Sequence, residues 1–345
     1  MNAIIKPAVV TPVVAAAPLD RLGRPLRDLR VSVIETCNFR CPYCMPAESH
    51  PDEPLFGRIN RLDFAQIEMA VRAFVALGVR KLRLTGGEPL LRRDLPQLVH
   101  QLAQIPGIED LALTTNGSLL AAQAQALRDA GLRRLTVSLD TLNPQRFSLM
   151  TGGRGRVEDV LAGIAAAERA GLTRLKINAV VQRGLNDGDV LDLAAHFRGS
   201  EHVVRFIEYM DVGTCNGWRR ENVVPSAQVR DVIAARWPLR ALEPNYRGEV
   251  ARRYAYADGQ GEIGFISSVS APFCGDCHRA RLSADGKLYT CLFADQGHDL
   301  RPWLHDESAL AQHLHGLWSA RADRYSELRG AAASGRHIEM YVIGG

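Results

Sequence analysis

The feature that most constrains the fold is a join that occurs three times, in which a helix ends on glycine and a strand follows. The apolar spacing predicts a helix over Leu62–Leu77, with a capping box at its start and Gly78 after its end. The same pattern, a helix that ends on glycine and is followed by a strand, occurs at Gly131 and Gly171. Repetition of this unit predicts a parallel sheet made of βα units.

Further segments fit the same pattern. Strands are expected at Val31–Ile34, Val79–Leu84, Asp110–Thr114, Leu132–Val137, Leu172–Ile177 and Val203–Glu208, and helices at Leu119–Ala130, Val157–Ala170, Asp189–Phe197 and Ser226–Trp237. About six βα units are fewer than the eight of a closed TIM barrel. We therefore expect an α/β fold, a partial (β/α)6 TIM-like barrel, with its chemistry at the carboxyl ends of the strands.

Polar residues stand where several of these strands end. A Thr-Gly-Gly-Glu-Pro run at residues 85–89 offers exposed backbone groups at Gly87 and a carboxylate at Glu88. Thr114 and Ser138 follow on the next two strands, and Met210 lies just past the sixth. Each could be a cap or a turn, but together they predict one polar site.

Cysteines form the first candidate metal group. Cys37, Cys41 and Cys44 can share one tight loop, and thiolates suit iron–sulfur clusters, zinc and Cu(I). Structural zinc and standard cubane clusters usually take four protein ligands. Three thiolates therefore predict a metal position left for a ligand that is not protein. A zinc or disulfide cluster with this spacing is the alternative.

A second group comprises Cys274, Cys277 and Cys291. His278 could complete a zinc site with these cysteines, so iron–sulfur and zinc both stay open here. Arg279 and Arg281 follow two residues apart, so on an extended segment both side chains project to the same side. Guanidinium groups there would suit a phosphate.

Composition limits the partners and the compartment. A net charge of +4 over 345 residues is too small to indicate nucleic acid, but it allows a small polyanion where arginines cluster. Seven cysteines, six of them in two tight groups, favour a reducing, cytoplasmic compartment over disulfides. Residues 1–18 are interrupted by prolines and have no membrane-spanning length. We expect residues 1–20 to be a disordered tail.

The cysteine spacing of residues 37–44 is similar to that of the radical S-adenosylmethionine (SAM) superfamily. Together with Thr-Gly-Gly-Glu-Pro, Phe-Ile-Glu-Tyr-Met-Asp-Val-Gly at residues 206–213, Cys-His-Arg-Ala-Arg-Leu-Ser-Ala-Asp-Gly at 277–286 and the terminal Ile-Gly-Gly, the chain resembles the GTP 3′,8-cyclase family, also called molybdenum-cofactor biosynthesis protein A. The resemblance runs from about residue 22 to the end. It implies a C-terminal extension with a second iron–sulfur cluster.

The resemblance also implies roles for individual residues. One 4Fe-4S cluster is held by Cys37, Cys41 and Cys44, and a second by Cys274, Cys277 and Cys291. SAM contacts are expected at Tyr43, Gly87, Glu88, Ser138 and Met210, and GTP contacts at Arg30, Arg83, Thr114, Lys176, Arg279, Ala280 and Arg281. Arg279, Arg281, Gly344 and Gly345 are expected to act in catalysis.

The implied reaction begins when SAM is cleaved to a 5′-deoxyadenosyl radical, which removes the ribose 3′ hydrogen of GTP. Attack on C8 of guanine then yields 3′,8-cyclo-7,8-dihydro-GTP. The family also implies a flavodoxin- or ferredoxin-type electron donor, hand-off to cyclic pyranopterin monophosphate synthase and a homodimer. Residues 21–240 are expected to form the barrel, and residues 241–345 the second-cluster and GTP-binding region.

Two other classes remain as alternatives. One is a radical-SAM enzyme that modifies peptides and carries an auxiliary cluster, although such enzymes usually have more C-terminal cysteines. The other is a non-catalytic iron–sulfur carrier or zinc-stabilised binding protein, which would need no cavity of substrate size.

Overall fold

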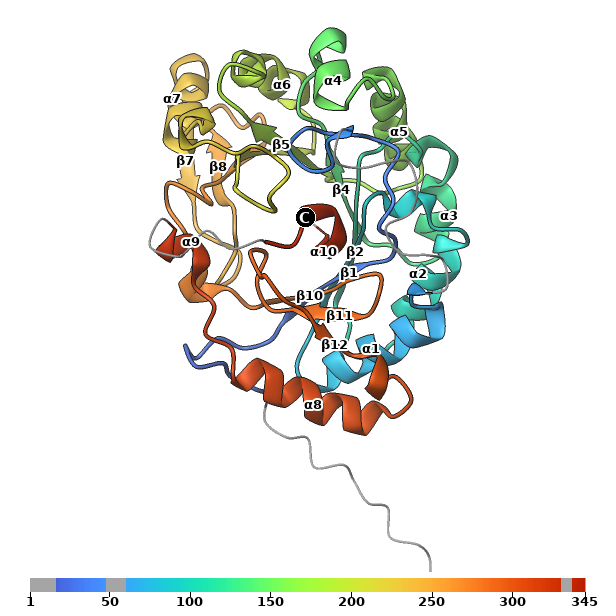
Figure 1. Ribbon diagram of the computed structural model, residues 1–345. Helices are drawn as coiled ribbons and strands as arrows, with labels where there is room; N and C mark the ends of the chain where they lie inside the picture. The colour runs from blue at the N-terminus through green and yellow to red at the C-terminus, as the bar shows by residue number, and fades with distance from the viewer. Residues whose placement is uncertain (1–16, 48–59, 330–336, 345) are drawn as a thin grey trace, which may run out of the picture.

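The computed structural model describes residues 17–47, 60–329 and 337–344. These residues form an α/β fold with a single curved sheet, whose strand order is β12-β11-β10-β1-β2-β3-β4-β5-β6-β9-β8-β7. Helices cover the outside of the sheet, and the short C-terminal helix α10 (Met340–Ile343) lies in the space that the strands surround (Figure 1).

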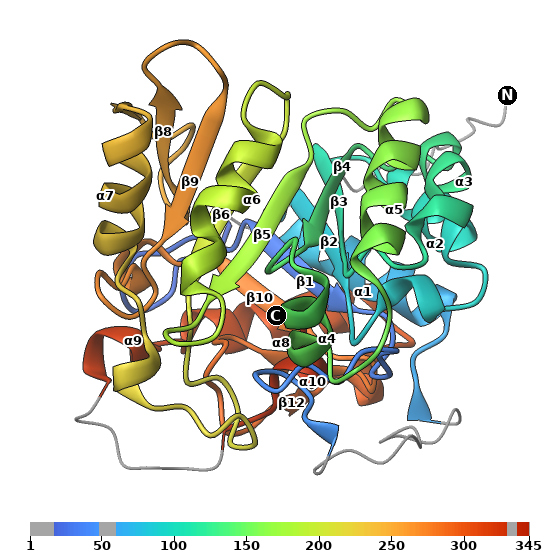
Figure 2. The same ribbon diagram turned by 90° about the horizontal axis from the view of Figure 1, so that it is seen from above.

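The central strands confirm the expected parallel arrangement. They are β1 (Asp28–Ser32), β2 (Lys81–Thr85), β3 (Asp110–Thr115), β4 (Arg134–Ser138), β5 (Lys176–Val181) and β6 (Val203–Glu208). Each is parallel to the next in chain order. The helices between and after them are α1 (Phe64–Ala76), α2 (Leu95–Ala103), α3 (Ala124–Asp129), α4 (Pro144–Met150), α5 (Val157–Arg169), α6 (Val190–Phe197) and α7 (Ser226–Arg236). In Figure 2, α7 lies on one side of the strands, and α2, α3 and α5 lie on the other.

The helix-to-strand joins form for the predicted reason. Asp63 and Gln66 make the reciprocal capping box at the start of α1. Gly78, Gly131 and Gly171 have φ of +107°, +103° and +81°, a left-handed conformation that other residues rarely adopt. Glycine therefore ends each helix and turns the chain toward the sheet.

The strand expected at Val31–Ile34 begins three residues earlier in the structure, as β1 (Asp28–Ser32), and two further predicted elements are interrupted. The helix expected over Leu119–Ala130 is divided into a 3₁₀ turn at Leu120–Ala122 and α3, because the turn packs against α5. The strand expected directly after Gly171 begins only at β5, because Arg174 has a φ of +53° and breaks the extended backbone. In both places a local backbone bend interrupts a regular sequence pattern.

The C-terminal region extends the same sheet on both sides. On one side β8 (Arg252–Tyr256) and β9 (Glu262–Ile266) form an antiparallel hairpin, and β9 lies parallel to β6. On the opposite side β10 (Arg279–Leu282) lies parallel to β1. The remaining elements are β7 (Leu239–Leu242), β11 (Lys287–Tyr289), β12 (His298–Asp299), α8 (Glu307–Ser319) and α9 (Tyr325–Leu328).

The two sides of each central strand differ in character. On β2, Leu82 and Leu84 are almost completely buried and join the apolar core of the molecule. The alternate residues Lys81 and Arg83 line the inner pocket. Because side chains alternate along a strand, the sheet carries a hydrophobic outer face and a charged inner face.

The beginning of the chain was expected to be a tail over residues 1–20. Residues 1–16 lie outside the described residues, whereas Asp20 has a completely buried side chain and belongs to the fold. None of the helices in the described part of the chain combines the length and apolar character needed to cross a membrane.

Candidate active site

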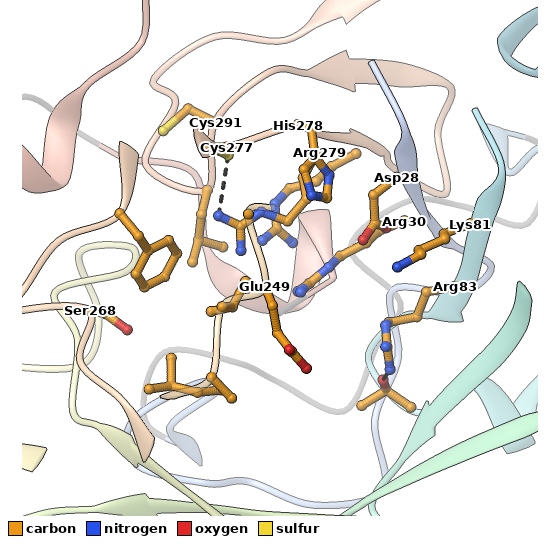
Figure 3. A pocket seen from close by; sticks show the side chains of 18 of the residues that line it. Asp28, Arg30, Lys81, Arg83, Glu249, Ser268, Cys277, His278, Arg279 and Cys291 are labelled. Carbon is orange, nitrogen blue, oxygen red and sulfur yellow. Dashed lines mark hydrogen bonds between the residues drawn. The ribbon is translucent and has the colours of Figure 1, made fainter. Parts of the chain in front are cut away.

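A pocket lies inside the curved sheet (Figure 3). It encloses about 1570 Å³ of non-atom space, including open solvent at its mouth. Its basic lining residues are Arg30, Lys81, Arg83, Arg134, Lys176, Arg205, Arg279, Arg281 and Arg321. Asp28, Asp110, Glu249 and Asp323 are the acidic ones. Positive charge therefore exceeds negative charge, as binding of a polyanion requires.

Strand register brings several of these cations together. Arg30 on β1 lies opposite Arg83 on β2 and opposite Arg281 on β10. The three side chains project to the same face because they hold equivalent positions in the pleat. The Nε of Arg30 is buried and has no hydrogen-bond partner. A donor buried in this way is costly unless a ligand satisfies it.

Residues of β3, β4 and β5 orient two further cations. Arg83 donates hydrogen bonds of 3.0 Å to the hydroxyls of Thr114 and Thr136. Arg205 donates to the Oδ1 of Asn178 at 2.9 Å. Burial, followed by the charges of Arg83 and Arg134, lowers the pKa of Arg205 to about 9. The side chains are thus preorganised around a concentration of positive charge.

The pKa of Lys176, at the start of β5, is also strongly lowered. Burial lowers its pKa to about 6, and the charges of Arg205, Arg134 and Arg83 add to this effect. An ammonium group with no bound anion is therefore disfavoured in this pocket.

The second cysteine group lies at this pocket. Cys274, Cys277 and Cys291 all line it, and Arg279 donates from Nη2 to the sulfur of Cys277 at 3.2 Å (Figure 3). Burial alone would raise the pKa of Cys277, but the charges of Arg279 and Arg321 lower it to about 6. The structure therefore brings the expected second-cluster cysteines together with expected GTP-binding arginines.

The C-terminal tail reaches the same place. Arg281 is buried and donates from Nη1 to the carbonyl oxygen of Gly344. Gly344 has a φ of +67°, and a Cβ there would lie 2.2 Å from the Cγ2 of Thr85. Only glycine fits this contact without a shift. Gly345 lies outside the described residues, and the buried Ala280 is not among the lining residues of the pocket.

The first cysteine group occupies the loop after β1. The sulfur of Cys37 accepts hydrogen bonds from the backbone N–H of Phe39 at 3.3 Å and from Asn116 at 3.8 Å. Burial raises the pKa of Cys37 to about 11 and also raises those of Cys41 and Cys44. The loop thus gathers three cysteines in a low-dielectric environment.

The Gly-Gly-Glu-Pro loop lies against the residues that precede Cys37. A Cβ at Gly87 would come within 2.3 Å of the carbonyl oxygen of Thr36, so glycine is needed for this close approach. Glu88 is almost fully buried, and its carboxylate accepts from the backbone N–H of Leu90 and Asn116 and from the hydroxyl of Thr115. Burial raises the pKa of Glu88 to about 7.

The remaining expected SAM contacts are divided between two places. Tyr43 donates from its hydroxyl to Asp140 at 2.8 Å, which ties the cysteine loop to the residues after β4. Ser138 ends β4, two residues before this carboxylate. Met210 instead lines the cationic pocket.

The donors present fit two anionic thiolate sites. Sulfurs in both groups accept N–H bonds, and the Nη2 of Arg24, close to the second group, is buried without a partner. Among the described residues, no three His, Cys, Asp or Glu side chains are close enough to hold a single metal ion. His278 is buried beside the second group, and its Nδ1 has no partner.

Sequence reasoning missed several pocket residues. Lys81, Arg134 and Arg205 line the pocket, although the sequence predicts them only as parts of strands, and Asn178 lies one residue beyond the strand expected at Leu172–Ile177. The sequence pattern that could have identified them is a charged or polar residue at every second position of strands whose other residues are apolar. Cys215, the seventh cysteine, donates to Glu339 of the tail at 2.9 Å.

Comparisons with known proteins agree with this geometry. The Radical SAM superfamily model matches residues 31–197, and the Molybdenum Cofactor Synthesis C model matches residues 202–327. SuiB from Streptococcus suis, crystallised with its precursor peptide SuiA, has a TM-score of 0.63 over 88% of this chain and 67% of that chain. At 14% identity, this likeness shows a shared fold.

Much closer relatives exist. A protein from Xanthomonas campestris pv. campestris named GTP 3′,8-cyclase is 66% identical over 97% of this chain and 99% of its own length. Another protein named GTP 3′,8-cyclase, from Acidothermus cellulolyticus, is 55% identical over 92% of this chain and 90% of its own length. The fold and the cysteine site thus define a radical SAM protein. Within that superfamily, the chain belongs to the GTP 3′,8-cyclase family.

Proposed function

We propose that this protein is a radical SAM enzyme that converts GTP to 3′,8-cyclo-7,8-dihydro-GTP in the first step of molybdenum cofactor biosynthesis. The observation that carries the proposal is the cation-lined pocket that contains the second cysteine group and is reached by the C-terminal tail. An electron carrier needs no such cavity. The 66% identity to a relative named for this reaction supports the same substrate.

In this proposal Cys37, Cys41 and Cys44 hold a 4Fe-4S cluster, and Tyr43, Gly87, Glu88, Ser138 and Met210 surround SAM. Cys274, Cys277 and Cys291 hold a second 4Fe-4S cluster. When bound, the first cluster and SAM supply the radical chemistry that removes a ribose hydrogen from GTP. The proposed division of the chain follows, with the first cluster in residues 21–240 and the second in residues 241–345.

The task of the chain itself is to hold GTP in one orientation. Arg30, Arg83, Thr114, Lys176, Arg279, Ala280 and Arg281 are the proposed GTP contacts from the sequence, and the pocket adds Lys81 and Arg205. Opposed guanidinium and ammonium groups neutralise the triphosphate, while Arg83 is held in place by two threonine hydroxyls. Fixing the ribose in a reactive position is worth about 7–11 kcal/mol of the barrier in favourable cases.

The tail contributes by closing the site. Arg281 fixes the carbonyl of Gly344, and Thr85 packs against this glycine. A backbone segment at this position excludes water without introducing a side chain that could be oxidised. Gly344 and the adjacent Gly345 are therefore proposed to act together with Arg279 and Arg281.

The proposed partners follow from this reaction. A flavodoxin- or ferredoxin-type protein supplies electrons, and the product passes to cyclic pyranopterin monophosphate synthase. We further propose a homodimer in the cytoplasm, where a reducing medium protects the cysteines.

The proposal is tested with protein purified and reconstituted without oxygen. Iron and sulfide are counted per chain, and 5′-deoxyadenosine is measured after addition of reductant and SAM, with and without GTP. We expect about eight irons, since each cluster contains four, and 5′-deoxyadenosine formation that depends on GTP.

Two variants test the second cluster and the GTP-binding pocket separately. Cys291→Ser should lower the iron content by about four per chain, because it removes one ligand of the second cluster. Lys176→Met should keep both clusters and lose affinity for GTP. Four irons with zinc in the wild-type protein, or SAM cleavage indifferent to GTP, would refute the proposed substrate site.

A further inference from the structure

A group of buried charges lies behind the second cysteine group. The side chains of Asp20, Arg24 and Arg321 are 0%, 2% and 1% exposed. Asp20 accepts from the Nε of Arg24 at 2.6 Å and from the Nη1 of Arg321 at 3.1 Å. One carboxylate therefore serves two guanidinium groups, and Asp323, which is partly exposed, adds a second bond to Arg321 at 3.2 Å.

Both arginines hold the backbone that carries the cysteines. Arg24 donates from Nη1 to the carbonyl oxygen of Cys274 at 2.6 Å. Arg321 donates to the carbonyl oxygens of Cys277 at 2.7 Å and of Thr290 at 3.1 Å. Because Thr290 immediately precedes Cys291, the two arginines together fix all three cysteine segments.

The two arginines differ in one contact. Arg321 also donates from Nη2 to the sulfur of Cys277 at 3.4 Å, and its guanidinium lies 4.6 Å above the ring of Trp318. Within the described part of the chain, Arg24 has no such bond to a sulfur, and its Nη2 is buried without a partner. The chain therefore offers two buried arginines in one network, of which only Arg321 contacts a thiol.

In the residues that the structure describes, the N–H bonds to the first cysteine group differ in kind. In the described part of the chain, the N–H donors to the sulfur of Cys37 are the backbone of Phe39 and the side-chain amide of Asn116, both uncharged. The sulfur of Cys277 accepts hydrogen bonds from two guanidinium groups, those of Arg279 and Arg321, in addition to the backbone N–H of Arg279. Charge-assisted hydrogen bonds are about twice as strong as neutral ones.

We propose that Arg321 is a positioning residue of the second cysteine group, which orders Cys277 and sets the reduction potential of the cluster held there. This inference rests on the proposed second 4Fe-4S cluster. Hydrogen bonds to cluster sulfurs and nearby positive charge stabilise the reduced, more negative form. Loss of the bond from Arg321 therefore lowers the potential of the second cluster, while the first cluster is unaffected.

Arg321→Lys and Arg24→Lys test this inference as a matched pair. Both substitutions keep a positive charge beside Asp20, and both remove the planar guanidinium fork. Each reconstituted full-length variant is titrated through a range of potentials while its clusters are followed by electron paramagnetic resonance. The signal that changes on addition of SAM belongs to the first cluster, and the other belongs to the second.

In Arg321→Lys we expect a midpoint shifted to more negative potential for the second cluster and an unchanged midpoint for the first. In Arg24→Lys we expect both midpoints to equal those of the wild type. Loss of second-site iron in Arg321→Lys alone would also support the positioning role, since the first cluster reports that the fold is intact.

Three results would overturn the inference. One is an unchanged second midpoint in Arg321→Lys at full iron content. Another is an equal shift, or equal loss of iron, in both variants, which would indicate general structural damage. The third is about four irons per chain in the wild-type protein, half of the total for two clusters. That last result contradicts the proposed second cluster itself and is recognised before any variant is made.

Discussion

Lys176 illustrates how a single residue is tuned by its surroundings. Burial and the neighbouring arginines lower its pKa to about 6, so at neutral pH the empty pocket contains mostly the uncharged amine. A bound triphosphate reverses this balance because it favours the ammonium form. Binding of GTP should therefore be accompanied by uptake of a proton.

This coupling predicts how the affinity for GTP depends on pH. We expect the pKa of Lys176 to be higher in the complex than in the free protein, so its contribution to affinity is complete below about pH 6 and falls as pH rises above this value, by at most about tenfold per unit. Calorimetry near pH 8, in buffers of different ionisation enthalpy, measures the proton uptake. Lys176→Arg should bind GTP without taking up this proton. Equal uptake in that variant would assign the proton to another group.

Arg281 has two duties in the pocket, since it lines the cavity and holds the carbonyl of Gly344. Arg281→Ala should raise the KM for GTP and lower kcat, with both clusters intact. A charge-assisted hydrogen bond of about 1.5–3 kcal/mol corresponds to a loss of about 10–100-fold in kcat/KM. Steady-state kinetics with iron analysis measure this, and unchanged kinetics would argue against the role of Arg281.

At the scale of elements, the tail is anchored at two points. Glu339 accepts from the backbone N–H and the hydroxyl of Thr214, both at 2.8 Å, and from Cys215. Arg281 holds the other end at Gly344. The short helix α10 is thereby fixed across the inner face of the sheet.

Removal of either anchor should affect turnover rather than iron content. Deletion of Gly344 and Gly345 is expected to abolish product formation, and Glu339→Ala is expected to reduce kcat by at least about tenfold, because each charge-assisted bond is worth about 1.5–3 kcal/mol. Glu339→Gln, which keeps an acceptor oxygen, is the matched control. Full activity in the deletion variant would show that the tail is dispensable.

Two helical glycines have opposite surroundings. A Cβ at Gly163 in α5 would lie 2.5 Å from the carbonyl oxygen of Gly117, whereas a Cβ at Gly316 in α8 would meet nothing within 4 Å. Gly316→Ala should stabilise the protein by about 0.5–1 kcal/mol, because alanine loses less entropy in a helix. Gly163→Ala should destabilise it by about 1–3 kcal/mol through overpacking. Thermal denaturation distinguishes the two, and equal shifts would contradict this account.

Structural features that depend on residues near one another in sequence were predictable, whereas those that depend on residues distant in sequence were not. Asp63, Gln66 and the glycines after helices act within a few residues, so the capping box and the joins were predictable. The basic pocket residues were recovered only in part, since Lys81 and Arg205 converge through strand register. Arg321 could not be predicted, because its partners Asp20 and Cys277 are distant in sequence.

At the scale of the whole molecule, the two regions of the chain share one sheet. Strand β9 pairs with the edge of β6, and strand β10 pairs with the edge of β1. The proposed boundary at residue 240 therefore separates functions within a common sheet.

A chain ending at residue 240 should not fold independently. It would leave β1 and β6 with unpaired edges, which favour association between chains. We expect such a fragment to aggregate and to lack a sharp thermal transition, as measured by size-exclusion chromatography and circular dichroism. A monomeric fragment with cooperative unfolding would contradict this prediction.

The pairing of β1 with β10 also has a consequence for biosynthesis. The ribosome makes the loop of Cys37 early, yet β10, the neighbour of the strand that supports this loop, emerges only after most of the chain has been translated. We therefore expect both cysteine groups to reach their final surroundings late, so that insertion of the proposed clusters follows translation. Slow elongation near the end of the message would lengthen the interval in which the thiols are open to oxidation.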